Sequence, residues 1–151
     1  MRLRLRPIHL VTMTSKQTFS VPIRLEVGVV KKKTHYINLN NYRNWAFQLN
    51  NSLKKQFKIE VAEIVRSLEP YDKPVKISYE IFYPTRRVFD IDNIGSVVTK
   101  FTHDALVEFG VIEDDNYKIV QEITYRFGGV DKDNPRCDVT IEEVTDADVE
   151  E

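Results

Sequence analysis

Residues 75–110 read VKISYEIFYPTRRVFDIDNIGSVVTKFTHDALVEFG and carry the clearest strand and helix patterns of the chain. Over residues 75–83, Val, Ile and Tyr occupy every second position, which predicts a half-buried strand that Pro84 ends. Over residues 94–109, apolar side chains recur at three- and four-residue intervals, which predicts a helix closed by Gly110. A strand followed by a helix is therefore the centre of the expected fold.

Two strands and a second amphipathic helix are expected upstream of this unit. Residues 19–30 and 31–37 are rich in β-branched and apolar side chains, and each segment predicts a strand. After Asn38 or Asn40, either of which suits a helix cap, apolar residues recur at helical spacing until a proline stops them. This pattern predicts one long helix, with Trp45 on its buried side.

Two further strands are expected downstream, over residues 119–127 and 139–144. Gly128, Gly129 and Pro135 lie between them and indicate a hairpin. The complete order is then β-β-α-β-α-β-β. This order predicts an α+β fold in which two helices pack on a mixed β-sheet.

The length of 151 residues suits one compact domain. We expect an N-terminal extension at residues 1–18, the domain at 19–144 and an acidic, disordered tail at 145–151, with Met13 as an alternative start. No window approaches the run of about 20 apolar residues that crosses a membrane, so no membrane association is expected. The single cysteine, Cys137, excludes an internal disulfide and favours a reducing compartment, so the cytoplasm is expected.

Charge is distributed unevenly, although the net charge is only -1. Residues 1–76 hold 15 Lys and Arg against 5 Asp and Glu, whereas residues 77–151 hold 7 against 18. A basic surface attracts phosphate backbones, and clustered carboxylates repel them unless a cation lies between. The uneven distribution of charge favours a nucleic-acid-binding protein that uses a metal ion. The alternative is that the basic and acidic halves simply form two solvated surfaces of complementary charge.

The segment Asp90-Ile91-Asp92-Asn93 joins the central strand to the helix behind it. Two carboxylates at i and i+2 on extended backbone project to the same side, so Asp90 and Asp92 could hold one divalent cation. Arg86 and Arg87, just upstream, would meet the phosphate that the cation holds. The alternative is a helix cap, because Asp92 and Asn93 both suit that position.

A second acidic cluster, Glu113-Asp114-Asp115-Asn116, lies between the same helix and the next strand. The length of the helix separates this cluster from Asp90 and Asp92. The cluster could join them only if the following strand brought it back. The residues alone do not show this return.

The D-x-D-N spacing occurs a second time at residues 131–134, between Gly129 and Pro135. A polar turn explains this copy, and no metal role is expected there. The three histidines lack metal-ligand spacing and are expected to be ordinary polar residues: His9, His35 and His103.

Together these motifs resemble the RusA-type Holliday junction resolvases of phages and prophages. The resemblance rests on the arginines, on Asp90-Ile91-Asp92-Asn93, on a helix with Asp104-Ala105-Leu106, and on Gly110-Val111-Ile112-Glu113-Asp114-Asp115. A Gly-Gly turn before Val139-Thr140-Ile141 also fits. The similarity covers roughly residues 19–144, with its most specific part at 86–115.

The resemblance implies a homodimer that binds four-way DNA junctions and nicks two strands symmetrically, in DNA recombination and repair. It implies Mg²⁺ as the cofactor, for which Mn²⁺ could substitute. The family's metal carboxylates correspond to Asp90, Asp92 and Asp115, and its catalytic lysine has a candidate in Lys100. Two neighbouring acids are expected to support the site: Asp104 and Asp114.

The chain departs from the family pattern before and after D-x-D-N. Only Arg86 and Arg87 precede it, so phosphate contacts are also expected from a basic triplet: Lys31, Lys32 and Lys33. The alternative role of this triplet is to protect a sheet edge from pairing.

The helix is about one turn longer than in the family pattern. Counting back from Asp104 selects Lys100 as the catalytic lysine, whereas counting forward from Asp92 selects Ser96, which carries no charge. The alternative for Lys100 is an exposed lysine paired with Asp104 at i, i+4.

Three rival functions remain open at this level. The first is a non-catalytic DNA-binding protein, which would not cleave DNA in Mg²⁺. The second is a metal-dependent nuclease that cuts branched and flap DNA without preferring junctions. The third is a structural phage protein whose acidic tail contacts other proteins, which would show no salt-sensitive DNA affinity.

Overall fold

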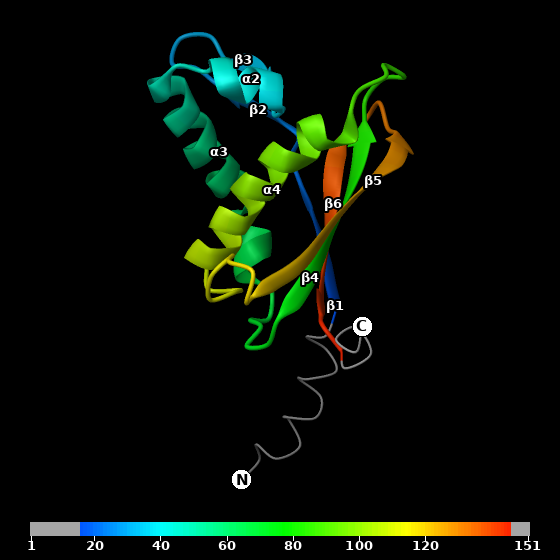
Figure 1. Ribbon diagram of the computed structural model, residues 1–151. Coiled ribbons are helices and arrows are strands. Elements are labelled where there is room, and N and C mark those ends of the chain that lie inside the picture. Colours follow the sequence, from blue (N-terminus) through cyan, green and yellow to red (C-terminus); the bar gives the residue numbers. More distant parts are fainter. Residues whose placement is uncertain (1–15, 146–151) are drawn as a thin grey trace.

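The computed structural model describes residues 16–145 (Figure 1). The elements in chain order are β1 (Lys16–Val21), β2 (Arg24–Val27), β3 (Lys33–Tyr36), α2 (Leu39–Asn44), α3 (Phe47–Arg66), β4 (Val75–Tyr83), α4 (Ile91–Glu108), β5 (Val120–Val130) and β6 (Arg136–Glu143). The expectations for most of the N-terminal extension, for Met13 as a start and for nearly all of the acidic tail lie outside the described residues.

The main sheet has the strand order β1-β6-β4-β5. Strand β6 is antiparallel to both β1 and β4, whereas β5 is parallel to β4. Helices α3 and α4 lie on the same side of this sheet (Figure 1), with α4 against β4 and β5 and α3 against β1. The expected α+β fold with a mixed sheet is therefore confirmed. Strands β2 and β3 form a separate antiparallel pair.

The expected hairpin between the last two strands is wrong, because β4 lies between β5 and β6. Strand β5 follows α4 and pairs parallel to β4, as strands joined by a helical crossover do. The chain then passes the end of β4, where Asp131 N donates to the Tyr83 carbonyl at 2.7 Å, and enters the sheet on the other side of β4. Cys137, Val139 and Ile141 are consequently fully buried in the central strand β6.

The single long helix expected after Asn38 is in fact two helices, α2 and α3. Asn38 caps α2, because its Oδ1 accepts from Asn41 N at 2.8 Å. The backbone is extended at Trp45 and Ala46, which interrupts the helical hydrogen bonds. The Trp45 ring lies 6.5 Å from that of Phe101, so packing on α4 accompanies the break and keeps Trp45 against the core, as expected.

Strand β1 also ends earlier than the 19–30 pattern predicts. Pro22 separates it from β2, and a proline lacks the N–H that a continuing strand would donate. The basic triplet then lies in the turn between β2 and β3 and at the start of β3, with all three lysines exposed: Lys31, Lys32 and Lys33.

Helix α4 is anchored on β5 by a close approach at Gly95. A Cβ at Gly95 would lie 2.7 Å from the Tyr125 ring, so the helix comes nearer to the sheet than a larger residue allows. One turn later, Thr99 Oγ1 donates to the Tyr125 hydroxyl at 3.0 Å. These two contacts fix the position of α4 along β5. No helix in the part of the chain that the structure describes is long and apolar enough to cross a membrane.

We predict that Gly95→Ala lowers the free energy of unfolding by about 1–3 kcal/mol, because the added methyl displaces the Tyr125 ring. An unobstructed helix position would instead gain up to about 1 kcal/mol from the same change. Urea denaturation measures the difference. A variant as stable as wild type would contradict the close approach of α4 to β5.

Candidate active site

Asp90 and Asp92 lie at the start of α4. Asp90 is the N-cap residue, and its backbone carbonyl accepts from Asn93 N at 3.0 Å. Because the helix begins at Ile91, only Asp90 has the extended backbone that the i, i+2 argument assumed, and Asp92 lies in the first helical turn. Both carboxylates are exposed, one helical turn or less apart.

The capping alternative does not account for these carboxylates. The N-cap position belongs to Asp90 rather than to Asp92 or Asn93, and the Asp90 side chain makes no capping hydrogen bond. Within residues 16–145, neither carboxylate has a hydrogen-bond or ion-pair partner, so both are available to a ligand.

The acidic loop after α4 carries two neighbouring carboxylates, Asp114 and Asp115, of which only one is used in hydrogen bonds within the loop. The Asp114 carboxylate organises the loop, because Oδ1 accepts from Asp115 N at 2.7 Å and Oδ2 from Asn116 Nδ2 at 2.8 Å. The Asp115 carboxylate is exposed and makes no hydrogen bond to the rest of the described chain. Asp115 is therefore the carboxylate of this loop that is free to bind a ligand.

Within a single chain, Asp115 lies far from Asp90 and Asp92. The 18 residues of α4 lie between them, which corresponds to a separation of about 27 Å along the helix axis. In Figure 1 the loop after α4 lies at the far end of that helix from residue 90. Across residues 16–145, no three His, Cys, Asp or Glu side chains group so that they could hold a metal ion.

The condition under which the two acidic clusters could meet, a return of Asp115 by the next strand, is not fulfilled within one chain. Because β5 is parallel to β4, it begins where β4 begins, and Val75 N donates to the Ile119 carbonyl at 2.8 Å there. Strand β5 runs from the end of the sheet near Asp115 to the end near Asp90. Because Asp115 precedes β5, it remains at the end of the sheet that is far from Asp90.

Lys100 is exposed in the middle of α4. It lies eight residues beyond Asp92, or about 12 Å along the helix axis. The structure describes no ion pair between Lys100 and Asp104, so the alternative of a paired surface lysine gains no support. The hydroxyl of Ser96, the other counted position, is buried without a hydrogen-bond partner in the described chain.

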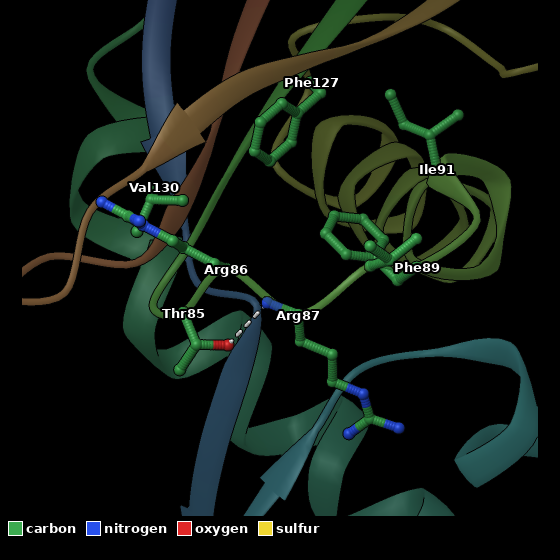
Figure 2. Close-up of a pocket in the computed structure, with 8 residues that line it drawn as sticks. Thr85, Arg86, Arg87, Phe89, Ile91, Phe127 and Val130 are labelled. Carbon is green, nitrogen blue, oxygen red and sulfur yellow. Dashed lines mark hydrogen bonds between the residues drawn. The ribbon is translucent and has the colours of Figure 1, made fainter.

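The loop between β4 and α4 carries Arg86 and Arg87, both exposed. Figure 2 shows their side chains extending in opposite directions, with Phe89, Phe127 and Val130 around a cavity of about 450 Å³. The loop is braced by Arg87 N, which donates to Thr85 Oγ1 at 3.3 Å. The arginines and the carboxylates of the α4 N-terminus therefore occupy the same end of the molecule.

The sequence profile described as Endodeoxyribonuclease RusA matches residues 26–142. The chain belongs to the RusA endodeoxyribonuclease family. A comparison with curated proteins finds no match. The family match extends from the end of β2 almost to the end of β6, and so it includes both acidic clusters, the arginines and all of α4.

In this RusA-family chain the second D-x-D-N copy has the structural role expected of it. Asp131 Oδ1 accepts from Asn134 N at 3.0 Å, and Oδ2 accepts from Arg136 Nη1 at 2.9 Å. These hydrogen bonds, the backbone one first, hold the pKa of Asp131 below its usual value. The carboxylate is engaged in a turn, in contrast to those of Asp90 and Asp92.

Sequence reasoning missed a polar cavity beside Asp90. It has a volume of about 680 Å³ and lies between the end of β3, the start of α2 and the β4–α4 loop. Its lining includes Asn38 and Asn40, which were considered only as helix caps, and Asn41, to which no role was assigned. The sequence signal that could have indicated this polar cavity is the presence of three asparagines within residues 38–41, because a helix cap needs only one.

His103 is a buried residue of α4 near the Asp115 end. Burial lowers the pKa of His103 from its ordinary value, and the opposing effects of Asp115 and Asp104 are smaller. Its Nε2 has no partner among the described residues. A charge on this ring would therefore be poorly accommodated in the folded protein.

We predict that the protein loses stability as the pH falls through about 6.5, the ordinary histidine pKa, because the unfolded state then binds a proton that buried His103 resists. Above that pH both states are neutral at this position, so the contribution is constant. Urea denaturation at pH 7.5 and 5.5, in chelator, measures the effect. A His103→Gln variant should lose less stability over this range; an equal loss would contradict the assignment.

Proposed function

We propose that this RusA-family protein is a Mg²⁺-dependent endonuclease that resolves four-way DNA junctions by paired symmetric nicks, as a homodimer, in recombination and repair in the cytoplasm. Mn²⁺ could replace Mg²⁺. The observation that carries the proposal is the pair of unpartnered carboxylates, Asp90 and Asp92, placed beside Arg86 and Arg87 in a chain of a nuclease family.

The donor set suits the ion. Mg²⁺ prefers carboxylate oxygens and retains several waters, so one or two carboxylates from one chain and one from another are a sufficient protein contribution. Asp115 is the third candidate ligand, and in our proposal it comes from the second chain. A shared site is the arrangement that reconciles two acids at the start of α4 and one beyond its end with a single metal position.

The free edge of the sheet offers a route to such a dimer. Strand β5 is one of the two edge strands of the main sheet, and Ile123 and Phe127 are 41% and 50% exposed on it. If two β5 strands paired antiparallel about a two-fold axis, the start of each would lie beside the end of the other. The end of β5 is close to Asp90, because Phe127 contacts Phe89 with ring centroids 6.0 Å apart.

This pairing would therefore carry the Asp115 loop of one chain towards the α4 N-terminus of the other. A two-fold axis near Thr124 would also set Glu122 of each chain opposite Arg126 of the other, which would add a second carboxylate to the ion pair that Arg126 makes with Glu80 of its own chain. Two equivalent sites would face opposing strands of a junction, as paired nicks require.

The remaining roles follow from charge and position. Asp90 and Asp92 of one chain and Asp115 of the other would hold the Mg²⁺, which would supply an activated water and neutralise charge on the scissile phosphate. Arg86 and Arg87 hold the flanking phosphates, and a further basic contact comes from the β2–β3 turn: Lys31, Lys32 and Lys33. Lys100, exposed on α4, stabilises the charge that develops in the transition state. Asp104, one turn further along, supports this face of the helix.

We predict that Asp90→Asn abolishes Mg²⁺-dependent cleavage of a labelled four-way junction while leaving junction binding within about twofold, because it removes a metal ligand and not the basic surface. Asp133→Asn, in the structural D-x-D-N copy, is the matched control and should cleave like wild type. Duplex and flap substrates, each with Mg²⁺ and with chelator, test the junction preference. Wild-type rates in Asp90→Asn would refute the metal assignment.

We predict that Asp90→Asn and Asp115→Asn, each inactive alone, regain activity when the two proteins are refolded together. A mixed dimer has one intact site, formed by Asp90 and Asp92 of one chain and Asp115 of the other, so about a quarter of wild-type sites return at random pairing. The rescued product should be singly nicked. No rescue by dimers shown to exchange subunits would exclude the shared site.

A further inference from the structure

We propose that the polar cavity beside Asp90 receives one unstacked nucleobase of the DNA strand being cut, and that Asn40 and Asn93 read the edge of that base. The cavity, defined here as the base pocket, has a volume of about 680 Å³. The inference rests on the proposed nuclease function and adds to it a site for sequence recognition.

The location of the base pocket ties it to the scissile phosphate. Asp90 and Asn93, at the start of α4, form one wall, and Arg87 lies on the same wall. A metal held by Asp90 would fix a phosphate at the rim of the pocket. A nucleotide next to that phosphate then has its base within reach of the pocket.

Of the four asparagine side chains that line the pocket, two make hydrogen bonds within the protein and two do not. Asn38 and Asn41 are used by the protein, because Asn38 Oδ1 accepts from Asn41 N at 2.8 Å and Asn41 Nδ2 donates to the Tyr36 carbonyl at 2.9 Å. Within residues 16–145, the side chains of Asn40 and Asn93 make no hydrogen bond. Each retains a donor and an acceptor, the pair of groups with which asparagine recognises base edges.

Aromatic rings supply the surface on which a base could stack. Tyr36 and Tyr83 line the pocket with ring centroids 6.0 Å apart, and Tyr83 lies 4.8 Å from Phe89. Tyr36 is held in place by Arg24, whose Nη1 donates to the Tyr36 hydroxyl at 3.1 Å. Stacking of unpaired bases on such rings stabilises single-stranded DNA in many proteins.

The lining excludes other occupants of this size. Amides, hydroxyls and one guanidinium make the pocket mostly polar, which disfavours an apolar protein segment or a lipid chain. The volume suits a small planar ligand, within the usual range of about 300–1,000 Å³ for such sites. A junction crossover supplies bases that are easily unstacked, so the energetic cost of filling the pocket is low there.

The test uses wild-type protein and four-way junctions in chelator, so that the DNA stays intact. The base analogue 2-aminopurine, which brightens when it unstacks, is placed in turn at each position around the crossover. Binding should raise its fluorescence at one position beside the nick site. Tyr36→Ala should remove that signal and weaken binding about tenfold, whereas Tyr36→Phe, which keeps the ring, should retain both.

Cleavage over a set of junctions with every base at that position provides a second readout. Asn40→Ala should reduce the preference between bases about tenfold or more, and Asn51→Ala, an exposed asparagine of α3 outside the pocket, should leave it unchanged. If the junction is bound and cut but no 2-aminopurine position responds, or if the signal survives Tyr36→Ala, the base pocket is refuted. If wild-type protein neither binds nor cuts junctions, the proposed function itself fails.

Discussion

The close packing of α4 on β5 is the constraint on which the rest of the structure depends. Gly95 allows the helix to touch the Tyr125 ring, and the Thr99 hydroxyl fixes the register one turn later. A straight helix held in this way keeps its two ends apart, since it cannot bend to bring Asp90 and Asp115 together. The three candidate metal ligands are thereby divided between opposite ends of one rigid element: Asp90, Asp92 and Asp115.

This division gives each end of α4 a different chemistry. The N-terminal end joins carboxylates to Arg86 and Arg87 and to the base pocket, so the proposed metal, phosphate and base contacts would occur together there. The C-terminal end offers one free carboxylate, Asp115, on a loop that Asp114 organises. Neither end is a complete metal site, and the exposed β5 edge lies between them. The proposed dimer places the Asp115 loop of one chain beside the N-terminal end of α4 of the other.

The local parts of the fold were predictable because their signals are local. The alternation over residues 75–83 gives β4 to the residue, and the periodicity over 94–109 gives α4 apart from its first turn, which begins at Ile91. The hairpin prediction failed because strand partners are set by long-range contacts: β6 lies between two strands and buries every second side chain, whereas β5 forms an edge. The break at Trp45 likewise accompanies contacts with α4 rather than any breaker residue nearby.

The candidate site was predictable in composition but not in geometry. The D-x-D-N motif and the arginines pick out the start of α4, which lies within the residues that the family profile matches. That Asp115 rather than Asp114 is free follows only from hydrogen bonds within the loop. That Asp115 lies far from Asp90 follows from the parallel pairing of β4 and β5, which no residue pattern reveals.

The central claim is that three carboxylates meet only across two chains. A crystal structure of the wild-type protein with Mn²⁺, located by its anomalous scattering, tests it most directly. The account predicts two equivalent ions related by a two-fold axis, each bound by Asp90 and Asp92 of one chain and by Asp115 of the other. An ion bound by Asp90 and Asp92 with every Asp115 carboxylate remote from it would contradict the account.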